Sequence, residues 1–280
     1  MPKIKIVTDS TCDLPQDIVK ELDITVAPLT VRFGQEIYRD GVDITSEAFF
    51  YKLKNSKTFP TTSQVSVGQF TEIFEELSKD YDEIVGIFIS SKLSGTYQSA
   101  VIAKNVLGLQ QIHILDSRAA TLALGLMVME AAKMAREGKD ADEIKNRITY
   151  ISDNLHTVII LGTLTYLQKG GRIGSGTALV GNLLNIMPIL TFNNGEVKMI
   201  DKIRGKKRMI KWIMNHMESL NIDLAGKSLG INYVGCDELV EELKQAISGR
   251  FKVSEFIVGT VGSVIGTYSG PDLAIGVYIY

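Results

Sequence analysis

The sequence predicts an α/β protein of two domains, the first with a parallel sheet and the second with a more antiparallel sheet. Two observations lead to this prediction. In the first half, short apolar runs are each followed by a polar turn and a helical pattern, as in the crossover units of a parallel sheet. After about residue 160, a hairpin signal and further strands follow. We therefore expect domains at 1–160 and 161–280, with a ligand between them.

The N-terminal domain is expected to contain three buried strands, at 3–7, 83–89 and 112–115. Their apolar runs are continuous, which is typical of strands that are covered on both faces.

Helices are expected to cover this sheet. One at 69–79 has a capping-box start formed by Ser66 and Gln69. A long helix rich in Ala, Leu and Met is predicted at 118–136. The segment at about 23–60 has no clear period, and we expect an irregular excursion that packs on the other domain.

The C-terminal domain is expected to begin with a hairpin. Its turn is Asn194-Gly195, which supplies the positive φ angles that a tight turn needs. The remaining predicted elements are a helix at 206–220 and strands at 228–234, 252–258 and 273–280.

Composition excludes several classes of function. The formal net charge of the 280 residues is −2, so bulk electrostatics do not favour nucleic acid as a partner. The most apolar stretch, at 119–129, is shorter than the roughly 20 residues that a membrane span needs. Cys12 and Cys236 form no CxxC motif, which is typical of a reducing compartment. We therefore expect a cytoplasmic protein.

Motifs for catalysis and nucleotide binding are missing. The run 226–228, Gly-Lys-Ser, resembles the end of a phosphate-binding loop, but Asn221 stands where that motif needs a glycine. There is no GxSxG motif of a serine hydrolase. The three histidines lie in or beside apolar runs without metal-ligand spacing. We expect no catalytic residue, no metal and no cofactor.

A cluster of hydroxyl groups stands between a predicted strand and a predicted helix. It is SSKLSGTYQSA at 90–100, in which Ser94, Gly95 and Thr96 occupy the turn. The first N–H groups of a helix lack internal partners and carry partial positive charge, so a carboxylate or phosphate fits there. Ordinary helix capping by Ser94 is the alternative.

Two further polar segments are expected to meet this cluster. PTTSQVS at 60–66 contributes Thr62 and Ser63, and LQKGGRI at 167–173 contributes Arg172. Loops at the carboxyl ends of parallel strands converge on one crevice. No general base stands beside these hydroxyl groups, so anion binding is favoured over nucleophilic chemistry. A surface position in a glycine turn is the alternative for Arg172.

Six motifs, in their order along the chain, resemble the DegV family, which includes the bacterial fatty-acid-binding proteins called FakB. They are TDS, PTTSQVS, SSKLSGTYQSA, ILDS, LTYLQKGGRI and IGTYSGP. The resemblance implies a two-domain α/β protein that buries the tail of one long-chain fatty acid. It also implies that the carboxylate is presented to a separate fatty acid kinase, which makes an acyl phosphate for phospholipid metabolism. A small-molecule hydrolase or transferase that uses the same cleft is the competing expectation.

The resemblance also implies a site. Thr62 and Ser94 would bind the carboxylate, and Arg172 would support it through hydrogen bonds. Tyr268 stands where the family usually has a histidine, and its hydroxyl can still donate a hydrogen bond. The expected supporting residues are Ser63, Gly95, Thr96, Gly171 and Thr267. We expect Met, Leu, Ile and Phe to line the tail.

A basic run is the last candidate feature, with five cations in the seven residues 202–208. Cations at the start of a helix oppose the helix dipole, so another role is expected to keep them there. With the resemblance, we expect Arg204, Lys206 and Lys207 to form the surface for the kinase. The alternatives are a solvated helix start and transient membrane contact, worth about 1 kcal/mol per cation at best.

Overall fold

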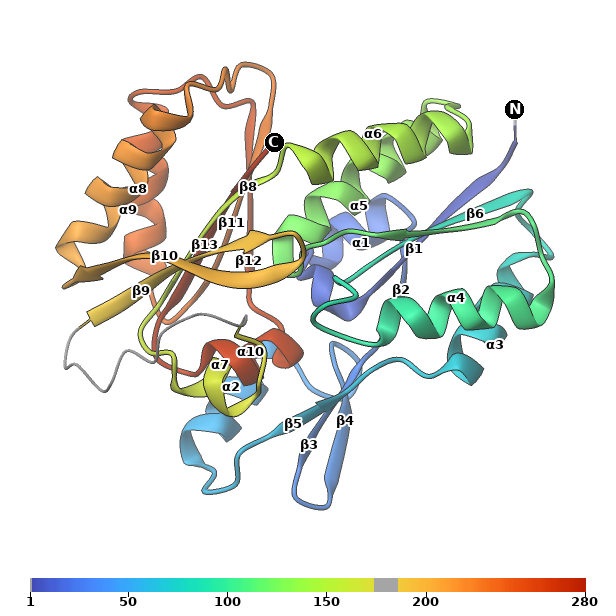
Figure 1. Ribbon diagram of the computed structural model, residues 1–280, viewed down its shortest axis with the longest axis horizontal. Coiled ribbons are helices and arrows are strands. Elements are labelled where there is room, and N and C mark those ends of the chain that lie inside the picture. The colour runs from blue at the N-terminus through green and yellow to red at the C-terminus, as the bar shows by residue number, and fades with distance from the viewer. Residues whose placement is uncertain (1, 174–185) are drawn as a thin grey trace.

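The computed structural model describes residues 2–173 and 186–280, and within them it shows three β-sheets with helices around them (Figure 1). The first sheet is parallel and has the order β2-β1-β6-β7. Its strands are β1 (Ile4–Asp9), β2 (Thr25–Ala27), β6 (Glu83–Phe88) and β7 (Ile112–Asp116).

Helices cover both faces of this sheet, which explains its continuous apolar strands. One core packs Val7, Ile84 and Phe88 against helices α3 and α4. The other packs Ile6 and Val85 against α5 and α6. The helices of this half are α1 (Gln16–Glu21), α3 (Val67–Leu77), α4 (Thr96–Leu107), α5 (Thr121–Arg136), α6 (Ala141–Asp153) and the short 3-10 helix η1 (Ser10–Cys12).

Local sequence signals account for most helix starts. The predicted capping box of Ser66 and Gln69 is confirmed, since each side chain bonds the backbone of the other residue. The helix predicted from residue 118 begins later, at Thr121. Arg118 and Thr121 have φ angles of 53° and 56°, which belong to the left-handed region and interrupt a right-handed helix.

The second sheet is mixed and has the order β10-β9-β8-β13-β11-β12, in which the described pairs are antiparallel except β11 with β12. β13 lies inside the sheet with every residue buried, so its sequence does not alternate. The strands are β8 (His156–Leu161), β9 (Ile186–Asn193), β10 (Glu196–Arg204), β11 (Ser228–Val234), β12 (Glu255–Thr260) and β13 (Ala274–Ile279). The predicted α/β class, with one parallel and one more antiparallel sheet, is confirmed.

The sequence predicted an irregular segment at about 23–60, and this prediction is wrong, because the segment is ordered. It forms β2, β3 (Thr30–Phe33), β4 (Glu36–Arg39) and α2 (Ser46–Asn55). β3 and β4 make a small antiparallel sheet with β5 (Thr61–Ser63). Strands of three or four residues are too short to show a period in the sequence.

The C-terminal half has four described helices, two of them short. They are α7 (Thr165–Lys169), α8 (Lys207–Leu220), α9 (Asp237–Ser248) and α10 (Ser263–Ser269). α10 packs against α2, where Ser46 Oγ donates to Val261 O at 2.5 Å and Phe49 and Phe50 lie close to Gly266. In the described part of the chain, no helix has the length and apolarity that crossing a membrane requires.

Candidate functional site

A cavity of about 400 Å³ lies between the two halves of the molecule, within the range typical of small-molecule sites. Its walls combine loops that follow the parallel strands with strands of the mixed sheet. The apolar wall includes Ile89, Ile159, Leu161, Leu190, Phe192 and Val197.

The described part of the cavity wall contains the expected Leu, Ile and Phe side chains, together with Val, and it contains no methionine. Methionines such as Met127 and Met209 are fully buried in the cores that cover the two sheets. Because sequence composition does not reveal which core a flexible apolar side chain joins, the expectation of methionine had no local support.

The β9–β10 hairpin forms one side of the cavity, and its tip is anchored on the first half of the molecule. Asn194 and Gly195 have φ angles of 48° and 85°, which confirms the predicted turn. Ser90 Oγ donates to Gly195 O at 2.7 Å. This contact places Phe192 and Val197 over the cavity.

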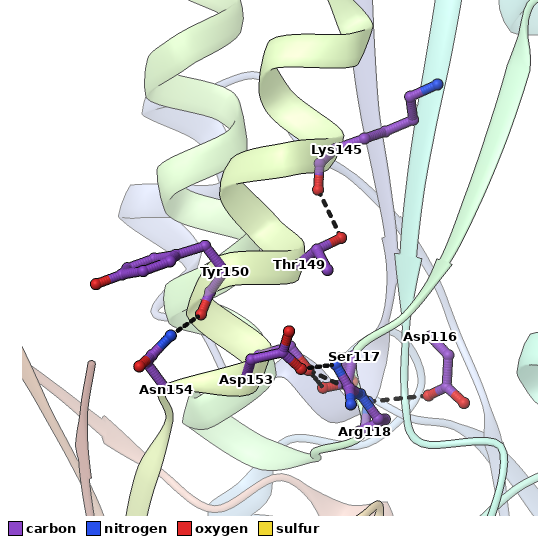
Figure 2. A network of polar contacts seen from close by, with 9 residues as sticks. Asp116, Ser117, Arg118, Lys145, Thr149, Tyr150, Asp153 and Asn154 are labelled. Atoms are coloured by element: carbon purple, nitrogen blue, oxygen red, sulfur yellow. Dashed lines mark hydrogen bonds and ion pairs between the residues drawn. The ribbon is translucent and has the colours of Figure 1, made fainter.

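A polar network holds the loop that leads into α5 (Figure 2). Gly195 at the hairpin tip lies beside Arg118 of this loop. Arg118 Nη2 lies 2.5 Å from Asp153 Oδ1 at the end of α6, and the Arg118 N–H donates to Asp116 Oδ1 at 2.9 Å. Ala120 and Thr121, directly after this loop, line the cavity. The network therefore fixes that part of the wall.

Four predicted residues meet at one polar end of the cavity, which Thr62, Ser94, Arg172 and Tyr268 all line. Thr62 Oγ1 lies 2.6 Å from Tyr268 Oη. Ser94 Oγ accepts the Thr96 N–H at 3.2 Å and lies 2.9 Å from Thr96 Oγ1. The helix cap itself is Gly95, so Ser94 stands just before α4 with its hydroxyl group at the cavity.

Arg172 contributes the positive charge at this end. Its Nε donates to Leu93 O at 3.2 Å and its Nη1 to Gly170 O at 2.7 Å. Its guanidinium carbon lies 5.2 Å from the centre of the Tyr268 ring, within cation–π range. These contacts use two of the five guanidinium N–H donors and orient the group.

The expected supporting residues do not all reach the cavity. Ser63 and Gly95 line it, and Thr96 contacts Ser94. Gly171 and Thr267 do not line it, and the Thr267 hydroxyl donates to Ser263 O inside α10 at 3.1 Å.

Sequence reasoning missed Gln64, although it stands in the PTTSQVS motif. It lines the cavity, and its Nε2 donates to Ser99 Oγ at 2.8 Å. A Cβ atom added at Gly95 would lie 2.1 Å from Gln64 Oε1, so the end of the Gln64 side chain packs against the bare backbone of Gly95. Gln64 directly follows three hydroxyl residues, Thr61, Thr62 and Ser63, and this position is the signal that could have identified it.

Arg172 is the one charged residue among the described residues of the cavity wall, and this part of the wall contains no His, Cys, Asp or Glu. None of the three histidines lines the cavity. Burial lowers the pKa of His156 and of His216. His113 Nε2 lies 3.0 Å from Glu83 Oε2. The described residues also contain no group of three His, Cys, Asp or Glu side chains placed to hold a metal ion. Chemically, this arrangement suits a ligand that has an apolar body and an acidic head group.

The basic run lies outside the cavity wall. Arg204 is exposed at the end of β10, and Lys206 is exposed just before α8. The side chain of Lys207 lies outside the described part of the structure.

The model of the DegV family, described as uncharacterised, matches residues 3–280. The chain belongs to the DegV family. A DegV domain-containing protein of Caldanaerobacter subterraneus subsp. tengcongensis is 41% identical over 274 residues, which is 98% of each chain.

Solved DegV structures share the fold. A DegV family protein from Thermus thermophilus, described for its fatty acid binding, has a TM-score of 0.90 at 32% identity and 99% coverage of both chains. A stearic acid-binding protein from Eubacterium ventriosum has a TM-score of 0.86 at 26% identity, covering 99% of this chain and 98% of that one. These structural neighbours are thus proteins that bind fatty acids.

Proposed function

We propose that this DegV protein is a cytoplasmic carrier that holds one long-chain fatty acid between its two domains. The tail lies along the apolar wall, and the carboxylate meets Thr62 and Ser94, with Arg172 and Tyr268 beside them. The observation that carries the proposal is a cavity that combines a largely apolar wall with a cluster of hydroxyl groups beside the guanidinium group of Arg172. Its structural neighbours bind this class of ligand.

Estimated binding energies agree with a tail that supplies most of the affinity and a polar end that orients the carboxylate. Each buried methylene contributes about 0.8 kcal/mol, so some fifteen of them contribute roughly 12 kcal/mol before the entropy of association is subtracted. The polar end therefore orients the ligand more than it holds it. Two hydroxyl groups and one arginine suffice for that role.

We also propose that the carboxylate is presented to a separate fatty acid kinase. The polar end reaches the surface, because Arg172 and Ser63 are exposed and Ser94 is half-buried. A second protein could reach the head group there without removing the tail. The chain then serves as the lipid-binding subunit of the kinase system.

Native mass spectrometry tests the carrier proposal. We expect the purified protein to lose the mass of one fatty acid on organic extraction, and to take up palmitate or oleate afterwards. No loss and no uptake would exclude a lipid carrier. Hydrolysis of an ester by the protein alone would instead favour an enzyme.

The basic run provides a prediction for the partner. Lys206 borders a hollow lined also by Asp237, Glu238 and Glu242, so acidic groups of the same chain lie near its charge. Arg204 is thus the better probe. Arg204→Glu is expected to slow association with the kinase at low salt and to leave fatty acid affinity unchanged, because rim charges steer encounter.

The matched control is Lys198→Glu, an exposed position of the same strand outside the basic run. Association rates are measured by stopped flow at two salt concentrations, and screening should shrink the effect of Arg204→Glu at high salt. If both variants associate like the unmodified protein, the run is a solvated surface.

A further inference from the structure

Two buried carboxyl groups lie away from the fatty acid cavity, at a second cavity of about 560 Å³. Asp13 is 8% exposed and Asp40 is 5% exposed. A Cβ atom added at Gly262 would lie 2.7 Å from Asp13 Oδ1 and 3.5 Å from Asp40 Oδ2. The two carboxyl groups therefore border the same small space, and the bare backbone of Gly262 leaves room for both.

One carboxyl oxygen of this pair lacks a hydrogen bond of normal geometry. Asp13 accepts the Gly262 N–H at 3.0 Å and an Asn232 amide N–H at 3.3 Å. Asp40 Oδ1 accepts the N–H and the hydroxyl of Ser263, at 3.0 and 2.5 Å. Asp40 Oδ2 is buried and makes no hydrogen bond of normal geometry to a residue that the structure describes, although the Ser10 hydroxyl and the Val264 N–H lie near this carboxyl group. A buried ionised oxygen in that position is costly, whereas a protonated one can act as a donor.

The surroundings of the pair offer no compensating charge. Asp9, on β1, adds a third buried acid. Cys12 on η1 and Tyr278 on β13 are neutral near pH 7, because burial raises the pKa of each above its usual value. Across residues 2–173 and 186–280, no Lys or Arg forms an ion pair with these three acids.

Burial also raises the pKa of both members of the pair, and the charge of Asp40 raises that of Asp13 further. The pKa of Asp9 is raised to about 6 by burial, against the hydrogen bonds that it accepts from Ile89 and Thr11. Two neighbouring acids in such a place retain one proton between them above the pH at which an exposed aspartate loses its own.

The pair is connected to the head-group site through α10. Asp40 binds Ser263, the first residue of that helix, and Asp13 binds Gly262 directly before it. Tyr268 lies on the last turn of the same helix and contacts Thr62 at 2.6 Å. The helix is thus held by the carboxyl pair at one end and by the head-group cluster at the other.

We propose that Asp13 and Asp40 share one proton and act as a positioning pair for Tyr268, so that loss of this proton loosens α10 and speeds fatty acid release. Two negative charges would repel each other across Gly262 and disturb the bonds that hold the start of the helix. The ligand part of this inference rests on the proposed carrier function. The shared proton itself does not.

The first experiment follows unfolding without lipid. The folded pair keeps a proton that the unfolded chain releases near pH 3.9, so stability is expected to fall as pH rises from about 4 through the raised pKa of the pair. Asp40→Asn keeps an acceptor for Ser263 and is neutral, so the fall should be smaller. Part of the fall should remain, because Asp13 and Asp9 are still buried acids whose pKa values burial raises.

The control is Asp43→Asn, an exposed acid three residues from Asp40 that pairs with Arg39 at 2.9 Å. Its pKa is lowered to about 2, chiefly by the Arg39 hydrogen bond, so it should keep the fall seen in the unmodified protein. If the free energy of unfolding depends on pH equally in Asp40→Asn and in the unmodified protein, the proposal of a shared proton is wrong. Asp13→Asn is the second variant if Asp40→Asn does not fold.

The second experiment measures the release rate of a fluorescent fatty acid against pH. The unmodified protein should release it faster as pH rises, by up to about tenfold per pH unit, the limit for one proton. Asp40→Asn and Tyr268→Phe should both flatten this dependence, since the pair acts through Tyr268. Full dependence in Tyr268→Phe would overturn the positioning role. If no fatty acid binds at any pH, the carrier function fails, and the unfolding experiment still decides the shared proton.

Discussion

Replacing Val197 with tryptophan is expected to weaken fatty acid binding by about a hundredfold while the protein stays folded. Val197 lies on β10, is 7% exposed and forms part of the apolar cavity wall. An indole ring there occupies space that some four methylenes of the ligand would fill. At about 0.8 kcal/mol each, their loss corresponds to roughly 3 kcal/mol. The open cavity gives the ring room, which limits the strain of overpacking.

The matched control is Ile200→Trp on the same strand. Ile200 is 43% exposed and does not line the cavity, so this variant should bind palmitate and oleate like the unmodified protein. Affinities come from fluorescence displacement, and thermal unfolding shows that both variants fold. Normal binding by Val197→Trp would mean that the tail lies elsewhere.

Loss of the head-group hydroxyls is expected to have an effect of similar size. Ser94→Ala and Thr62→Ala should each remove a charge-assisted hydrogen bond worth about 1.5–3 kcal/mol, or roughly 10- to 150-fold. The two losses should not add, because both hydroxyl groups bind one carboxylate. Phosphorylation by the kinase should fall more than tail binding does.

Ser91→Ala serves as the control, since Ser91 is exposed in the same loop and does not line the cavity. Binding is measured by displacement and phosphorylation by the formation of acyl phosphate. Phosphorylation at the normal rate in both single variants would contradict the assignment of the carboxylate to these hydroxyl groups.

The sequence alone determined the elements that depend on local interactions. The strand predicted at 228–234 is β11, Ser228–Val234, because its apolar run lies between turn residues. The Ser66 capping box and the Asn194-Gly195 turn were predictable for the same reason: each is made by residues within a few positions of one another. The polar motifs that supply the candidate site were likewise visible in the sequence.

The tertiary structure decided which side chains meet. Thr62 and Tyr268 are 206 positions apart, and the packing of β5 and α10 brings their hydroxyl groups to 2.6 Å. Hydrogen bonds to Gly262 and Ser263 bring Asp13 and Asp40 together at the start of α10. The contact of Ser90 with Gly195 places Val197 in the cavity wall. Periodicity reports which face of an element is buried, but not against which distant element it is buried. For that reason the chemistry of the site could be predicted from the sequence, and the shape of the cavity could not.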